Sequence, residues 1–195
     1  KHTVFRLGEV HGRVTPRAEA MVKMLSSIDS AKVTTNLWGE RWSKLVTNAM
    51  RNGVTAASGM SSNQCDLEPI TQRLGIRLAG EGVRIGQALG FDLETISAFA
   101  PERWVAALDG DNTATVEIVK AMEESVQGRR EGMRPSMGQD MVKGRRTEID
   151  FINGVIAAKG EEIGIPAPAN AGLVAAVKRV EYGECEPSLE NVPSI

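Results

Sequence analysis

The chain has 195 residues, of which 42% are hydrophobic and 25% are charged, and its formal net charge at pH 7 is −2. This is ordinary globular usage, so the composition excludes a disordered or collagen-like chain, and the small charge excludes a general attraction to nucleic acid or anionic membranes. No apolar run approaches the ~20 residues of a membrane span, and an aromatic content of only 4% favours packed helices over a large sheet.

The first part of the chain reads as strand, helix and strand. Residues 4–9 and 31–35 are predicted strands, and between them Thr15 and Pro16 are the N-cap and first position of a helix. The apolar stripe of that helix is predicted at Ala20, Met21, Met24, Leu25 and Ile28. A unit of this size is too small to stand alone and indicates the edge of a parallel sheet. Because the chain also begins at Lys1 without an initiator methionine, we expect a piece of a two-domain protein.

Two long helices are predicted next. The first covers about residues 37–57, with a buried side formed by Trp38, Trp42, Leu45, Ala49 and Met50. The second covers about residues 68–89 and carries a stripe of small residues at Gly75, Ala79, Gly82 and Gly86. Because glycine is about 1 kcal/mol less favourable than alanine inside a helix, several glycines on one face indicate that another backbone passes very close.

The middle of the chain is predicted to hold shorter helices. One covers residues 93–99 and stops before Pro101, and another covers residues 113–126. The second of these is expected to point Val116, Val119 and Met122 inward. Residues 128–135 then form a basic, glycine-containing loop.

A well-marked helix is predicted at residues 147–163. Thr147 is its N-cap, Asp150 takes the N3 place of a capping box, and Gly164 ends it. Its core stripe is expected at Ile149, Ile152, Ile156 and Ile163. Asn170 is expected to cap a last helix that ends near residue 182, and the polar tail beyond it is predicted to fray.

The fold class that follows is mainly α. Residues 1–37 are predicted to be the small α/β remnant of a dinucleotide-binding domain, residues 38–183 a helical domain, and residues 184–195 a tail.

The rarer residues exclude several kinds of site. Cys65 and Cys185 are far apart, which favours a reducing cytoplasm over a disulfide scaffold. The histidines, His2 and His11, show no zinc-binding spacing, so no metal site is expected. The sequence contains neither GxGxxG nor GxxxxGK[ST], the glycine-rich phosphate loops. The chemistry that remains uses Lys, Asp, Glu, Asn and Ser side chains.

The most informative polar set is Lys44, Asn48 and Asn52. Residues spaced i, i+4 and i+8 lie along one helical face, and Thr55 falls on the same face. A solvated face is the plain interpretation, and lysine fits it. The two asparagines fit it less well, because asparagine is a poor interior helix former. One cation with two amides is suited to binding a carboxylate and a carbonyl oxygen.

A second set follows the basic loop. Ser136 by itself is typical of a turn or cap residue. Glu148 by itself is typical of a carboxylate that interacts favourably with the helix dipole, which stabilises a helix by about 0.3–1 kcal/mol. Positive charge gathers around them at Arg129, Arg130, Arg134, Lys143, Arg145 and Arg146. This charge is either a solvated loop or an electrostatic funnel for an anionic substrate or for cofactor phosphates.

Four motifs in order and at the right spacing resemble the C-terminal domain of the ketopantoate reductase (2-dehydropantoate 2-reductase) family. They are residues 42–52, residues 136–140, the run Thr-Glu-Ile-Asp-Phe-Ile-Asn-Gly at 147–154, and residues 164–170. The resemblance covers roughly residues 4–182. It implies a 6-phosphogluconate dehydrogenase-like helical domain that follows the last strands of a Rossmann domain.

The resemblance also implies roles for individual residues in NADPH-dependent reduction of a 2-oxo acid, ketopantoate to pantoate. Lys44 would be the general acid, and Asn48 and Asn52 would hold the substrate. Ser136 would bind the substrate carboxylate or a hydroxyl, and Glu148 would lie at the substrate and nicotinamide end of the cleft, as a catalytic and cofactor-binding residue.

The chain departs from the family pattern in two places. Ser62, which we count among the substrate-binding residues, stands where the family often has a further asparagine. The pair Arg134-Pro135 stands where many members carry another serine. Lys44, Glu148 and the two substrate amides are expected to form one hydrogen-bonded cluster.

Three interpretations stay open. The first is the substrate and catalytic half of the reductase, inactive without its NADPH-binding loop, with a small 2-oxo acid as partner and a homodimer as one assembly. The second is a helical dimerisation or binding module without chemistry, whose interface is the small-residue stripe. The third is a related reductase that acts on a different 2-oxo acid, such as one that makes sugar acids or opines.

Overall fold

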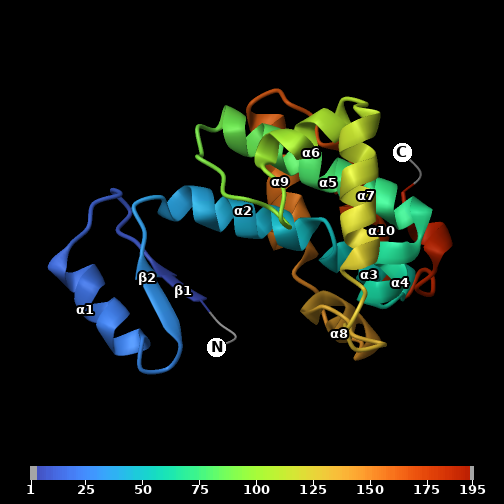
Figure 1. Ribbon diagram of the computed structural model, residues 1–195. Coiled ribbons are helices and arrows are strands. Elements are labelled where there is room, and N and C mark those ends of the chain that lie inside the picture. Colours follow the sequence, from blue (N-terminus) through green and yellow to red (C-terminus); the bar gives the residue numbers. More distant parts are fainter. Residues whose placement is uncertain (1–3, 194–195) are drawn as a thin grey trace.

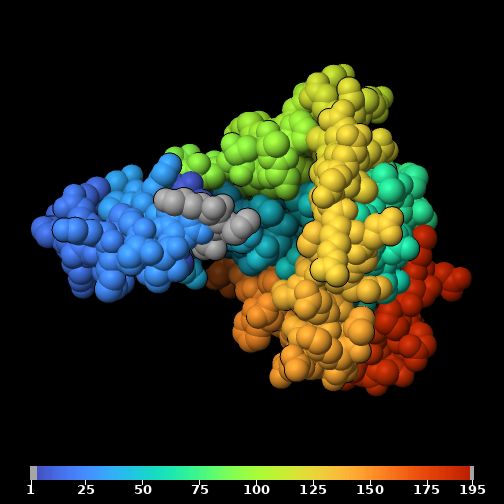
Figure 2. All heavy atoms as spheres, turned by 60° about the horizontal axis from the view of Figure 1, so that its bottom comes forward, coloured from blue at the N-terminus to red at the C-terminus, as the bar shows by residue number. Residues whose placement is uncertain are grey.

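The computed structural model describes residues 4–193, so Lys1, His2 and the last two residues of the predicted tail lie outside the described residues. A small N-terminal unit stands to one side of a larger helical body (Figures 1 and 2). Helix α2 begins beside the small unit and runs into the centre of the helical body (Figure 1).

The N-terminal unit is a parallel strand pair joined by a helix. Strand β1 (Val4–Leu7) pairs with β2 (Ser30–Val33), and α1 (Pro16–Leu25) connects them. The predicted start of α1 is confirmed, because the Thr15 side chain accepts a hydrogen bond from the Ala18 backbone N at 3.2 Å. Two short strands cover little of α1, so its predicted apolar stripe is largely exposed at Met21 and Met24.

The helical body is formed by the following elements: α2 (Leu37–Ala49), α3 (Asn52–Ser58), α4 (Ser62–Leu67), α5 (Pro69–Ala88), α6 (Pro101–Leu108), α7 (Asn112–Glu124), α8 (Ser136–Val142), the 3-10 turn η1 (Ile149–Phe151), α9 (Asn153–Glu162), α10 (Pro168–Glu181) and the 3-10 turn η2 (Leu189–Asn191). The long α5 is the central helix, and it packs against α2, α6, α7, α9 and α10. The mainly α fold class predicted from the sequence is confirmed.

Helix α2 covers the small-residue stripe of α5. The Trp42 indole N–H donates to the Gly82 carbonyl at 2.8 Å, and a Cβ added at Gly86 would collide with that indole nitrogen. A Cβ at Gly82 would lie 2.9 Å from the Val46 side chain. The predicted close approach is confirmed, and the element that approaches belongs to the same chain. The stripe is therefore buried inside the fold, where a second chain cannot use it as an interface.

The predicted helix 37–57 is wrong as one helix, because it breaks between α2 and α3 at Met50 and Arg51. Trp38 also lies outside the core, with 48% of its surface exposed. Its indole N–H donates to the Val10 carbonyl at 3.3 Å, and the Arg41 guanidinium lies 5.9 Å from its ring centroid.

The segment 93–99 is not the predicted helix. Ser97 and Ala98 have positive φ angles of 46° and 74°, and Ile96 and Phe99 form an isolated antiparallel bridge. The helix begins at Pro101 instead of ending there, because proline suits the first helical position. Tertiary contacts hold the turn: Ile96 is fully buried, and its carbonyl accepts a hydrogen bond from the Trp104 indole at 3.0 Å.

Val116 was predicted to point inward on α7, and this is wrong because 65% of its surface is exposed. The inward positions of α7 are Ala114, Ile118 and Met122, which are buried against the neighbouring helices.

The predicted helix 147–163 is also interrupted, into η1 and α9. Asp150 does not complete a capping box, because its carboxylate pairs with the Lys178 ammonium at 2.5 Å. The Thr147 hydroxyl lies 3.4 Å from the Ile149 backbone N, which is a long contact for a capping hydrogen bond. Ile163, placed in the core stripe by its spacing, is 37% exposed at the end of the helix.

The last two predictions about helix ends are wrong as well. Asn170 does not cap α10, which begins at Pro168, and its side chain is buried in the core. The tail does not fray within the described residues, because the Ser188 backbone N donates to the Ala57 carbonyl at 3.0 Å and Val192 is buried. These contacts attach η2 to α3.

No helix in residues 4–193 is long and apolar enough to cross a membrane.

Candidate functional site

Lys44 and Asn48 lie on one face of α2, one turn apart. The helix starts where the Asn36 side chain accepts a hydrogen bond from the Gly39 backbone N at 3.2 Å. Lys44 is exposed and Asn48 is half-buried, and within the described residues neither side chain makes a hydrogen bond or an ion pair. Both polar groups are therefore free to bind a ligand.

Asn52 follows the helix break and is the first residue of α3. It does not continue one regular helical face with Lys44 and Asn48, so the predicted i, i+4, i+8 row is wrong at its third member. The Asn52 side chain is half-buried and unpaired in the part of the chain that the structure describes. Thr55 is buried and structural, because its hydroxyl donates to the Asn52 carbonyl at 2.9 Å.

A buried polar network holds the break in place. The Asn153 amide donates to the Ala49 carbonyl at 3.1 Å and to the Asn170 Oδ1 atom at 2.9 Å. The Asn170 amide donates in turn to the Glu81 carboxylate at 2.8 Å, and that carboxylate also accepts the backbone N–H groups of Ala169 and Asn170. The network therefore joins the end of α2 to α5 and to the starts of α9 and α10.

Sequence reasoning missed this network. The available signal was Glu81, a carboxylate between two glycines on the buried side of α5. A buried carboxylate needs several donors, and the free N–H groups at the start of α10 supply them.

Glu148 stands on a segment that is fixed on both sides. The Thr147 backbone N donates to a Glu181 carboxylate oxygen at 2.6 Å. Ile149 is fully buried, and a Cβ added at Gly53 would lie 2.9 Å from its Cδ1 atom. The Glu148 segment therefore lies beside the start of α3, where Asn52 is located, while the Glu148 side chain itself is exposed.

Glu181 belongs to a charged cluster in which Lys178 contacts both Glu181 and Asp150. Burial by itself would raise the pKa of Glu181, but hydrogen bonds from Thr147 and Lys178 lower it below its usual value. The pKa of Lys178 is raised, first by its hydrogen bond to Asp150 and also by Glu181. This cluster anchors the Glu148 segment to α10.

Ser136 and Ser62 begin two short helices, α8 and α4, and both helices contact α3. Ser136 is the exposed first residue of α8, which packs on α3 with Gly138 facing Thr55. Ser62 is half-buried and begins α4, and its backbone N donates to the Met133 carbonyl at 2.8 Å. The two serines thus flank the loop that precedes α8.

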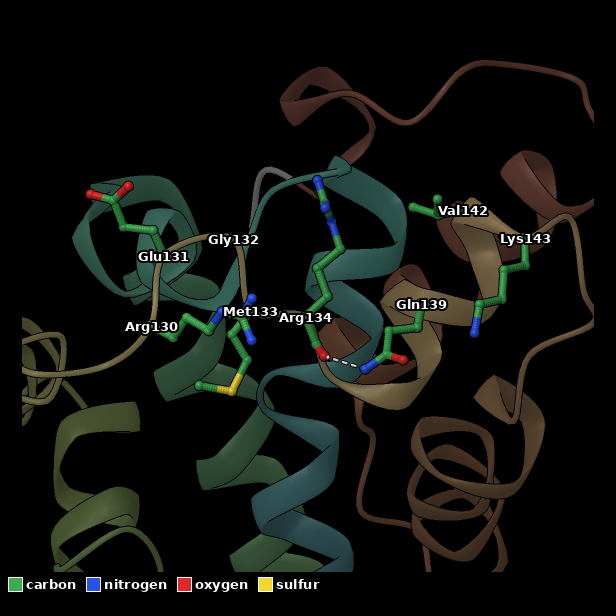
Figure 3. Close-up of a pocket in the computed structure, with 8 residues that line it drawn as sticks. All are labelled: Arg130, Glu131, Gly132, Met133, Arg134, Gln139, Val142 and Lys143. Atoms are coloured by element: carbon green, nitrogen blue, oxygen red, sulfur yellow. Dashed lines mark hydrogen bonds between the residues drawn. The ribbon is translucent and has the colours of Figure 1, made fainter.

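That loop and α8 line a cavity of about 450 Å³ (Figure 3). Three cations border it, but Arg134 and Lys143 point to different sides in this view (Figure 3). Arg134 is held by the Gly59 carbonyl at 2.8 Å, and its own carbonyl accepts from the Gln139 amide at 2.9 Å. Neither Ser62 nor Ser136 is among the lining residues.

The predicted basic cluster does not converge on one point. Arg129 is committed to an internal ion pair with Asp66 at 2.6 Å. Arg145 and Arg146 lie 3.7 Å and 3.6 Å from the Asp140 and Asp150 carboxylates.

Three of the predicted site residues, Asn52, Glu148 and Ser136, stand on segments that meet at α3. The segments of Glu148 and Ser136 both pack against α3. The expected hydrogen-bonded cluster is absent from residues 4–193, because Lys44, Asn48 and Glu148 make no hydrogen bond to one another there.

Comparison with known proteins identifies this arrangement of helices. Residues 36–181 match the model of a family described as ketopantoate reductase PanE/ApbA, C terminal. The chain belongs to this family.

The chain is also similar to one curated relative and to two solved structures. A 2-dehydropantoate 2-reductase of Archaeoglobus fulgidus is 30% identical over 178 residues, which are 91% of this chain and 52% of the relative. D-mandelate dehydrogenase in complex with NADH superposes with a TM-score of 0.72 at 20% identity, covering 92% of this chain and 55% of that one. A dimeric ketopantoate reductase from Staphylococcus aureus gives a TM-score of 0.67 at 18% identity, covering 93% and 55%. The chain spans about half the length of the curated relative.

Proposed function

We propose that this chain is the substrate-binding and catalytic half of an NADPH-dependent 2-oxo-acid reductase that converts ketopantoate to pantoate. The observation that carries the proposal is the unpaired Lys44–Asn48 face of α2, inside the region that matches the ketopantoate reductase family. The relative in Archaeoglobus fulgidus, named 2-dehydropantoate 2-reductase, supports the choice of substrate.

In this proposal Lys44 is the general acid. When hydride is added to the carbonyl carbon, negative charge develops on the carbonyl oxygen, and a proton from the Lys44 ammonium completes the hydroxyl group. Asn48 and Asn52 hold the substrate with amide donors. Ser136 and Ser62 bind its carboxylate or hydroxyl groups, and Glu148 lies at the nicotinamide side.

The described residues do not by themselves make a nicotinamide nucleotide site. They contain one parallel strand pair, and the sequence has no glycine-rich phosphate loop to cradle a pyrophosphate. We therefore propose that these 195 residues alone neither bind NADPH nor show turnover, and that a dinucleotide-binding domain supplies the cofactor. Reduced nicotinamide supplies the hydride when it is bound.

The test uses a polypeptide that carries this chain together with a dinucleotide-binding domain. Consumption of NADPH and of NADH is followed with ketopantoate and with a panel of other 2-oxo acids, including phenylglyoxylate. Preferred use of ketopantoate supports the proposal. Preferred use of an aromatic 2-oxo acid would instead support a related reductase, the second candidate, which the likeness to D-mandelate dehydrogenase favours. Failure to reduce any 2-oxo acid would overturn both.

We also propose a homodimer in a reducing cytoplasm. The dimeric relative from Staphylococcus aureus supports the dimer, and the two free cysteines, Cys65 and Cys185, support the reducing compartment. Light scattering on the purified protein tests the assembly, and a mass equal to one chain would contradict it.

A further inference from the structure

A cavity of about 300 Å³ lies behind the α2–α3 break. It is bounded by the break itself, by the turn at Ser97–Phe99, and by α6 and α7. Its deepest walls are Met50, Trp104 and Ile118, each with no more than 2% of its surface exposed. A cavity of this size with an apolar floor is typical of a small-molecule site.

The floor carries an aromatic corner. The Trp104 ring meets the Phe99 ring edge-on, with 6.1 Å between centroids and an interplanar angle of 89°. The indole N–H of Trp104 is already used by the Ile96 carbonyl and the indole is almost fully buried, so the partly exposed Phe99 ring is the aromatic surface that the cavity offers. This wall suits an apolar or aromatic ligand body.

A positive charge stands at the mouth. The buried Asp66 carboxylate is shared by two guanidinium groups, Arg51 at 3.3 Å and Arg129 at 2.6 Å. Neither arginine pairs with another carboxylate in residues 4–193, so one positive charge is unbalanced there. The Arg51 Nε atom is buried and has no hydrogen-bond acceptor, although the side chain as a whole is 28% exposed. A carboxylate at the mouth would balance the positive charge of this partly exposed guanidinium.

The rim of the cavity is strained. Ser97 and Ala98 both adopt positive φ, a conformation that residues with a Cβ rarely take. The Ser97 hydroxyl has only the Met50 sulfur as acceptor, at 3.7 Å. Strained turns of this kind are concentrated at ligand sites, where the surrounding fold holds them.

We propose that this cavity binds a small monocarboxylate with an apolar or aromatic body. The body would lie against Phe99 and Ala121, apolar residues of the lining that are partly exposed, and the carboxylate would pair with the Arg51 guanidinium. None of Lys44, Asn48 and Asn52 lines this cavity, so it is distinct from the face proposed to hold the 2-oxo acid. The proposal does not rest on the proposed reductase activity.

Calorimetric titration of the whole chain with phenylacetate tests the proposal, and neutral phenylacetamide is the matched probe. We expect saturable binding of phenylacetate and binding of the amide that is at least about tenfold weaker, because the amide cannot form a charge-assisted pair with Arg51. Arg51→Met, which removes the charge, and Ala121→Phe, which fills the cavity mouth, should each weaken phenylacetate binding by about tenfold or more.

Two control variants locate the ligand. Lys120→Met removes a cation from the outer surface of α7, and Asn48→Ala alters the proposed substrate face; both should leave phenylacetate binding unchanged. The proposal is overturned if phenylacetate does not bind, if the amide binds equally well, or if Arg51→Met and Ala121→Phe have no effect. It is also overturned if Asn48→Ala abolishes binding, because the probe would then occupy the substrate face. Circular dichroism confirms that each variant is folded.

Discussion

The side-chain amide of Asn153 donates a hydrogen bond to the carbonyl oxygen of Ala49, 104 residues earlier in the chain, at 3.1 Å. This carbonyl lies where α2 ends and the chain turns into α3. One amide on α9 thus ties the helix that carries Lys44 and Asn48 to the segment that carries Glu148.

Asn153→Ala should destabilise the fold by about 1–3 kcal/mol, because buried acceptors on Ala49 and Asn170 lose their donor. Urea unfolding followed by circular dichroism measures the change. Asn112→Ala is the matched control, because Asn112 is exposed at the start of α7, and it should change stability by less than about 0.5 kcal/mol. Equal effects of the two substitutions would contradict a structural role for the network.

Lys44→Ala should lower kcat/KM by about 10²–10⁴-fold in a polypeptide that includes a dinucleotide-binding domain, because the proposed general acid is lost. Steady-state consumption of NADPH with ketopantoate measures it. Lys23→Ala, at an exposed position of α1, serves as the control and should leave the rate unchanged. Near-normal turnover of Lys44→Ala would remove Lys44 from the mechanism.

Gly86→Ala should destabilise the protein by about 1–3 kcal/mol, because the new Cβ would collide with the Trp42 indole and separate α2 from α5. Gly154→Ala provides the comparison. A Cβ at Gly154 meets nothing closer than 3.5 Å, so this change should be neutral or stabilising by up to about 1 kcal/mol. Thermal unfolding measures the stability of both variants. A loss of stability for Gly154→Ala as large as for Gly86→Ala would argue against a specific α2–α5 contact.

Acid should weaken the anchor of the Glu148 segment. The folded pKa of Glu181 is lowered below its unfolded value of about 4.3. Its contribution to stability is therefore complete above that value and is lost as the pH falls through the lower folded pKa. Unfolding free energies measured between neutral and acid pH should show a shallower pH dependence for Glu181→Gln. The exposed Glu184→Gln variant should keep the slope of the parent.

Some of the fold was readable from short stretches of sequence. The start of α1 follows from Thr15 and Pro16. The Thr15 side chain accepts a hydrogen bond from a free backbone N–H of the first turn, and the Pro16 ring fixes a helical φ angle. The small-residue stripe of α5 indicated a close neighbour, because glycine in a helix is unfavourable unless something packs on it. The motifs around Lys44 and Glu148 were enough to indicate the family.

Other features depended on partners far along the chain. Nothing local marks the break at Met50 and Arg51. There the Ala49 carbonyl accepts a hydrogen bond from Asn153, and the Arg51 guanidinium pairs with Asp66, and both partners belong to other elements. Asp150 had suitable spacing for a capping box, but Lys178 is a charged partner 28 residues away and competes successfully for its carboxylate.

By itself, then, the sequence of 195 residues determined the mainly helical class, the family and the kinds of polar residue available for chemistry. Only the tertiary structure decided which polar groups are free, such as Lys44 and Asn48, and which are used inside the fold, such as Thr55 and Arg129. The reason is physical: turns and caps are settled within about four residues, whereas a buried polar group takes whichever partner the packing of distant helices brings within hydrogen-bond distance.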